Sequence, residues 1–198
     1  MTKAYVKFEA NISSASVLER IYEYLSKKTL PFEPDELLRA EYVMVVSAFD
    51  CYVHDYVRER MVKAFNNPST MSDKTRDYKI SLGVMMDIMN EPNPISRMQL
   101  LENAIKKAES AFSYQSSSSV EHVLGLVGFK KIWTTMFGSP TGGAKKSQLD
   151  LVVRRRNQIA HEADMNYATN IKNSIALTDV VEAKAFLVDL SQHIDSLT

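Results

Sequence analysis

The chain has 198 residues, a length that suits one large domain, and its 24 Lys and Arg are balanced by 24 Asp and Glu. Zero net charge argues against a uniformly basic nucleic-acid coat protein and against an acidic tail. A single cysteine excludes a disulfide framework and a cysteine-based zinc cluster, and no apolar run is long enough to cross a bilayer. We therefore expect a soluble protein of the cytoplasm, with no membrane partner.

The first predicted helix covers residues 15–27, where apolar side chains recur at helical spacing. Pro31 and Pro34 then interrupt the chain. We assign residues 1–34 to an N-terminal helix and connector and residues 35–198 to one helical domain, the two forming a single globular unit.

The second predicted helix, residues 35–66, is the longest and is dense in apolar residues, so we expect it at the centre of the core. Asp35 can cap its start, and Asn66-Asn67-Pro68 ends it. The next two predicted helices, residues 73–90 and 95–112, are separated by a segment with two prolines.

Ser118 and Glu121 fit a capping box that opens a predicted helix over residues 119–137. The run from Gly138 to Gly143 predicts a flexible loop. Two more helices follow, over residues 145–161 and from a cap at Asp179 and Glu182 to about residue 197. No segment alternates like a strand for long, so the predicted fold class is an all-α bundle.

One predicted helix, residues 145–161, has an arginine on its apolar face. Leu149, Val152 and Val153 lie on that face, and position 156 falls about 20° from Leu149 on a helical wheel. Arg156 therefore points where an apolar residue is expected. An inward guanidinium is costly unless it is paired or lines a cleft.

Two interpretations of Arg156 remain open at this point. It forms a buried salt bridge, with Asp50 or Asp55 as the expected partner, or it converges with Asn157 and His161 on an anion in a polar cleft. Arg and His together suit phosphoryl chemistry, because Arg binds phosphate with two donors and His transfers protons near neutral pH.

The run Arg156-Asn157-Gln158-Ile159-Ala160-His161 resembles the R-X4–6-H motif of the HEPN superfamily, which includes many ribonucleases. Residues 37–61, LLRAEYVMVVSAFDCYVHDYVRERM, look like the opening core helix of HEPN domains. With the stretches GFKKIW and RRRNQIAHEAD, the chain most resembles the HEPN group associated with RiboL-PSP systems. The resemblance covers roughly residues 35–197 and implies a four-helix core with additional helices.

The resemblance implies a metal-independent endoribonuclease that needs no cofactor and acts as a homodimer with one composite cleft. Arg156 would bind the scissile phosphate, Asn157 would orient His161 or the phosphate, and His161 would act as general acid or base while the ribose 2′-OH attacks phosphorus. The expected products are a 2′,3′-cyclic phosphate and a 5′-OH, which restricts the reaction to RNA. An antitoxin or defence-system partner is also expected.

Asp50 and His54 share a face of the long helix, because they lie four residues apart. Asp50 fits a place where the family often has an acidic residue facing the motif, so it is a candidate support for Arg156 or His161. The alternative is that Asp50 and His54 form a polar pair whose hydrogen bonds are satisfied near the helix surface. His54 taken alone is interpreted as a structural residue.

Residues 113–160 carry seven basic and two acidic groups, a net charge of +5 within a neutral chain. This block predicts a local basic groove for a phosphate backbone. The candidate substrate-binding residues in it are Lys145, Lys146, Arg154 and Arg155. On the helical wheel, Arg154 and Arg155 point about 120° or more away from the apolar face, toward solvent.

Large apolar side chains at helical spacing are interpreted as core rather than as base-stacking groups. These are Tyr52, Tyr56, Trp133, Met85, Met86, Met89 and Met98.

Three functions from different classes remain open. The leading hypothesis is an endoribonuclease of the toxin or defence type. The second is a non-catalytic HEPN module that binds nucleotide or RNA, or scaffolds a complex. The third is a helical interaction protein in which Arg156 makes a buried ion pair.

Overall fold

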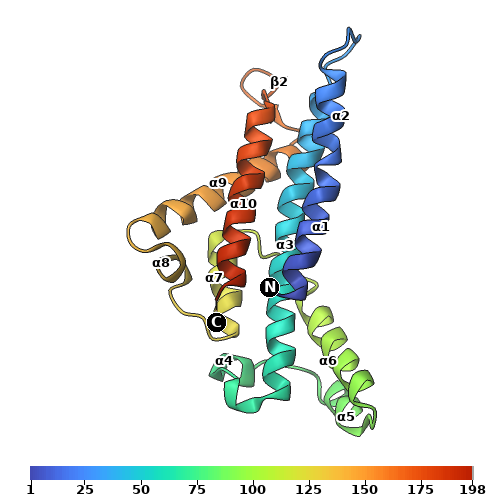
Figure 1. The fold of residues 1–198 in the computed structure, drawn as a ribbon, viewed down its shortest axis with the longest axis vertical. Coiled ribbons are helices and arrows are strands. Elements are labelled where there is room, and N and C mark those ends of the chain that lie inside the picture. The colour runs from blue at the N-terminus through green and yellow to red at the C-terminus, as the bar shows by residue number, and fades with distance from the viewer. Residues whose placement is uncertain (198) are drawn as a thin grey trace.

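The computed structural model describes residues 1–197 and confirms an all-α chain, with one short β-hairpin (Figure 1). The helices and strands, in chain order, are α1 (Lys3–Ala15), α2 (Val17–Leu25), α3 (Asp35–Asn66), the 3-10 turn η1 (Pro68–Thr70), α4 (Asp73–Arg76), α5 (Leu82–Asn90), α6 (Pro94–Glu109), α7 (Ser117–Leu126), α8 (Ile132–Phe137), α9 (Thr141–His161), β1 (Met165–Asn166), β2 (Ile171–Lys172) and α10 (Leu177–Asp195). In the described residues 1–197, no helix is both long enough and apolar enough to span a membrane.

Helix α3 is the central element, as the sequence predicts. Its limits are the predicted ones, since Pro34 precedes it and Asn67 and Pro68 follow it. Helices α1 and α2 pack along α3, α10 packs beside it, and α9 crosses the bundle (Figure 1). Tyr52 and Tyr56 of α3 are buried in the core, as predicted.

Helix α2 lies within the predicted helix over residues 15–27, whereas α1, which precedes it, is not predicted from the sequence. Thr2 caps α1 by accepting a hydrogen bond from the Tyr5 amide at 3.1 Å. Phe8 packs against Tyr52 of α3, with ring centroids 5.3 Å apart. The core is therefore shared between the first 34 residues and the rest of the described chain. Asp195 near the end of α10 binds the Thr2 amide at 3.2 Å, so the two ends of the described chain meet.

The predicted helix over residues 73–90 is divided into the short α4 and α5. The hydroxyls of Ser72 and Thr75 both donate to the Leu126 carbonyl, at 2.5 and 2.6 Å, and so hold α4 against α7. The interpretation of the methionines as core filler is wrong for two of them. Met86 and Met89 on α5 are 54% and 72% exposed.

The predicted helix over residues 119–137 is also divided. The cap is Ser116 rather than Ser118, since its hydroxyl accepts from the Ser119 amide at 3.2 Å. Helix α7 ends before Gly128, whose φ of +98° breaks the helical path, and α8 begins after Lys131. Trp133 of α8 is buried, as predicted.

Half of the predicted Gly-rich loop is helix. Helix α9 already begins at Thr141, so only Gly138 to Pro140 separate α8 from α9. Gly142 lies against the main chain of Trp133, where an added Cβ would sit 2.5 Å from the Trp133 carbonyl oxygen. This glycine allows a close approach of two helices and is not a sign of flexibility.

Candidate active site

The three motif side chains meet at the C-terminal end of α9. Nη1 of Arg156 lies 3.0 Å from Oδ1 of Asn157 and 3.5 Å from Nε2 of His161. Asn157 and His161 are one helical turn apart, and the long Arg156 side chain reaches across to both. His161 is exposed and Arg156 is partly buried, so the cluster opens to solvent at one end.

Arg156 makes no salt bridge with any carboxylate of residues 1–197. The partners proposed from the sequence are engaged elsewhere: Asp50 accepts the Tyr114 amide at 2.6 Å, and Asp55 pairs with Lys7 at 2.6 Å. The Nε atom of Arg156 is buried and has no hydrogen-bond partner in the described chain. The prediction of a buried salt bridge to Asp50 or Asp55 is therefore wrong.

Asp50 and His54 lie in a different polar cluster. Besides the Tyr114 amide, Asp50 accepts a hydrogen bond from Nε2 of Gln115 at 3.1 Å, and so ties the loop after α6 to α3. His54 sits between the carboxylates of Asp50 and Glu109, at 3.9 and 3.7 Å. None of these contacts reaches the motif, so they match the alternative of a satisfied polar pair.

The electrostatics of this cluster favour a charged imidazole. Burial lowers the pKa of His54, but the Glu109 carboxylate and the charge of Asp50 outweigh burial and raise that pKa above its ordinary value. His54 therefore links α3 to the end of α6 and lies between two acids that favour its protonated form.

The predicted substrate-binding residues are mostly ion-paired. Lys145 binds Asp189 at 2.9 Å and Lys146 binds Glu121 at 3.0 Å. Arg155 binds both carboxylate oxygens of a buried aspartate, Asp164. It therefore does not point to solvent, and the helical-wheel prediction for Arg155 is wrong. Arg154 is exposed and has no ion-pair partner within residues 1–197.

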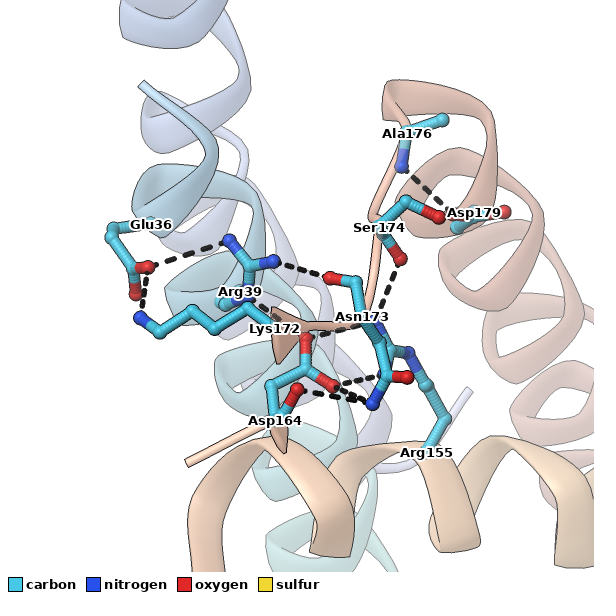
Figure 2. A network of polar contacts seen from close by, with 9 residues as sticks. All are labelled: Glu36, Arg39, Arg155, Asp164, Lys172, Asn173, Ser174, Ala176 and Asp179. Carbon is cyan, nitrogen blue, oxygen red and sulfur yellow. Dashed lines mark hydrogen bonds and ion pairs between the residues drawn. The ribbon is translucent and has the colours of Figure 1, made fainter. Parts of the chain in front are cut away.

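Asp164 lies three residues after the motif histidine, His161. It is 1% exposed and accepts hydrogen bonds from Arg39, Arg155 and Asn173 (Figure 2). Burial raises the pKa of Asp164, but the hydrogen bonds from Arg39, Arg155 and Asn173 outweigh burial and hold it below its ordinary value. Sequence reasoning missed this residue, because no spacing rule brings Arg39 of α3 to the segment after α9.

Residues 1–197 contain no group of three or more His, Cys, Asp or Glu side chains placed to hold a metal ion. The candidate site is therefore described by its own side chains: one guanidinium, one carboxamide and one imidazole at the end of a single helix.

Comparison with known proteins identifies the family. The family model RiboL-PSP-HEPN matches residues 9–198, which is nearly the whole chain. Neither a search of curated proteins nor a search of solved structures gave a significant match. HEPN domains are RNase-like or nucleotide-binding modules, and many of them bind RNA and dimerise. The chain belongs to the RiboL-PSP-HEPN family.

Proposed function

We propose that this protein is a metal-independent endoribonuclease whose active site is formed by Arg156, Asn157 and His161. The observation that carries the proposal is the position of the Arg156 guanidinium. It touches Asn157 and His161 and has no carboxylate partner within residues 1–197. Its charge is therefore available to an anion, and the bridging phosphate of RNA is an anion that a guanidinium binds well.

In this proposal His161 moves protons next to that phosphate. A neutral imidazole takes the proton of the ribose 2′-OH, the 2′ oxygen attacks phosphorus, and the bond from phosphorus to the 5′ oxygen breaks. A protonated imidazole gives its proton to the departing 5′ oxygen. The products are a 2′,3′-cyclic phosphate and a 5′-OH, and Arg156 stabilises the charge that builds on the phosphate oxygens.

One histidine cannot be both the base and the acid in the same step. The motif cluster of one chain supplies one imidazole, since the other histidines of the described chain lie on α3, α7 and α10. A homodimer in which two motifs face one cleft supplies the second imidazole. We therefore include the homodimer in the proposal.

The test is cleavage of a labelled RNA by His161→Ala and Arg156→Ala, beside two matched controls. The controls are His122→Ala and Arg20→Ala, which remove an exposed histidine and an exposed arginine outside the motif helix. We expect each motif variant to lose about 100-fold or more in rate, as for loss of a general acid–base or a phosphate-binding charge. The controls should cut like wild type.

Two results would count against this proposal. RNA that is bound by wild type and never cut would support a HEPN domain that binds RNA or scaffolds a complex. Motif variants that cut as fast as wild type would contradict the assignment of the site.

We also propose a toxin- or defence-type role, because 2′-OH attack can act on any accessible cellular RNA. Induced expression of wild type in a bacterial host should arrest growth and fragment host RNA, and His161→Ala at equal abundance should do neither. Growth arrest by both proteins would contradict a role that depends on cleavage.

A further inference from the structure

The segment after the motif has an unusual backbone. Ala163 and Asp164 both have positive φ, 51° and 58°, a conformation that costs a non-glycine residue free energy unless its surroundings hold it. The Gln158 carbonyl accepts hydrogen bonds from the amides of Glu162, at 3.1 Å, and Asp164, at 3.0 Å. These two bonds close the last turn of α9, the turn that carries His161.

Asp164 is held from three sides (Figure 2). Nε of Arg39, on α3, donates to its Oδ2 at 2.9 Å, and Nη2 of Arg155, on α9, donates to the same oxygen at 3.0 Å. Nη1 of Arg155 binds the other oxygen. Asn173, which follows the hairpin, binds its carbonyl oxygen through the main-chain amide at 2.8 Å and through Nδ2 at 3.0 Å.

Asp164 and Arg39 are inaccessible to a large substrate. Asp164 is 1% exposed and Arg39 is 7% exposed. Arg39 also donates to the Asn173 carbonyl at 2.7 Å. Its guanidinium thus connects α3 to the end of α9 and to the segment before α10. A substitution of Asp164 or Arg39 therefore does not act by removing a direct contact between that side chain and RNA.

The histidine itself has little else to hold it. The His161 side chain is exposed, and its one polar side-chain contact within residues 1–197 is Nη1 of Arg156 at 3.5 Å. Its position is therefore set mainly by the backbone of the last turn of α9. The contacts of Asp164 with Arg39, Arg155 and Asn173 hold that turn in place.

We infer that Asp164, clamped by Arg39 and Arg155, is a positioning residue that holds the end of α9 so that His161 stays beside Arg156. This inference rests on the proposed function, because the reaction is what the position of His161 serves. A reacting group misplaced by about 1 Å can lower a rate about 100-fold, so the clamp has a measurable consequence.

The experiment compares Asp164→Asn, which keeps the shape and removes the charge, with Glu41→Gln. Glu41 is an equally buried carboxylate of α3 that pairs with Lys184 of α10 at 3.2 Å and has no polar side-chain contact with α9 or the turn after it. Both variants break a buried ion pair. We expect Asp164→Asn to lower kcat by about 100-fold with KM changed less than about threefold, and Glu41→Gln to keep kcat when both are assayed well below their melting temperatures.

A second readout does not depend on activity. The NMR signals of the His161 ring, assigned by their loss in His161→Ala, report the surroundings of the ring. Amide hydrogen exchange reports the closure of residues 158–164. We expect Asp164→Asn to move the His161 ring signals and to speed amide exchange in residues 158–164, and Glu41→Gln to change neither. If Asp164→Asn does not fold, Arg39→Lys takes its place, because lysine keeps the charge and loses the fork that reaches both Asp164 and Asn173.

Failure of the inference and failure of the proposed function are distinguishable. Wild-type protein that never cuts RNA contradicts the proposed function, while the NMR and exchange measurements still test the clamp. An Asp164→Asn protein that folds, keeps the His161 signals and exchange rates of wild type and retains kcat would overturn the inference.

Discussion

Arg155 and Arg156 are neighbours on α9 whose side chains have different partners. Arg155 binds both oxygens of the buried Asp164, whereas Arg156 contacts only the polar groups of Asn157 and His161 and makes no salt bridge within residues 1–197. The charge of Arg155 is paired with a buried acid, and the charge of Arg156 has no carboxylate partner in the described chain.

The arginines paired with Asp164, Arg39 among them, and Arg156, which makes no salt bridge within residues 1–197, are predicted to contribute differently to stability. Arg39→Ala should lower the free energy of unfolding by about 3–5 kcal/mol, because it removes one partner from the buried Asp164. Arg156→Ala should change it by less than about 1 kcal/mol or increase it, since a functional arginine without a partner contributes little to folding. Urea unfolding measures both. A loss of several kcal/mol in Arg156→Ala would indicate a structural arginine.

If the protein acts as the proposed homodimer, an excess of inactive chains should lower the cleavage rate of wild-type chains. When His161→Ala is added in excess to wild type, most wild-type chains enter mixed dimers with a single catalytic histidine. The cleavage rate per wild-type chain should fall about tenfold or more at a tenfold excess, by random pairing and the loss of one proton-transfer group. RNA is kept in excess so that the variant does not deplete substrate. Adding His122→Ala instead should raise the total rate, and an unchanged rate with His161→Ala would favour a monomeric site.

The contact between α8 and α9 predicts different outcomes for two adjacent glycines. Gly142→Ala should destabilise the protein by about 1–3 kcal/mol, because its Cβ would overlap the main chain of Trp133. A Cβ added at Gly143 would meet no atom within 4 Å, so Gly143→Ala should stabilise by about 0.4–1 kcal/mol through the unfolded state. Thermal unfolding checks both, and equal effects would contradict the close packing at Gly142.

The cluster of His54 with Asp50 and Glu109 predicts a pH-dependent contribution to stability. Because the pKa of His54 is raised in the folded state, its contribution is fully present below its ordinary value of 6.5 and is lost as the pH rises through the folded pKa. The difference in unfolding free energy between wild type and His54→Gln should therefore shrink from pH 5.5 to pH 8. His122→Gln is the control and should show no such trend. A difference that grows with pH would mean that His54 is neutral when folded.

Much of the fold follows from the sequence because prolines and apolar spacing mark its longest helices. Helix α3 has the predicted limits, and α9 contains the predicted motif helix. Helix α1 could not be found in the same way, since it buries mainly Ala4, Tyr5 and Phe8 near its start and carries several polar residues after them. Its packing partner is α3, about 50 residues away, and no local pattern shows that contact.

The site follows from the sequence only in part. The spacing of Arg156, Asn157 and His161 along one helix predicts that their side chains lie close together. The structure brings these three side chains together. The direction of Arg155 depends on Asp164, which reaches it only because the chain turns back after α9. A helical wheel takes no account of the chain after the helix, so it predicts that Arg155 points to solvent.

The most direct test of the proposed reaction is cleavage in EDTA of an RNA strand and of the same strand with 2′-deoxy sugars at the sites that are cut. We expect wild type to cut only the RNA and to leave a 2′,3′-cyclic phosphate and a 5′-OH, and we expect His161→Ala to lose this activity. Cleavage of the deoxy strand at the same sites, products with a 5′-phosphate, or full activity in His161→Ala would contradict the proposed reaction.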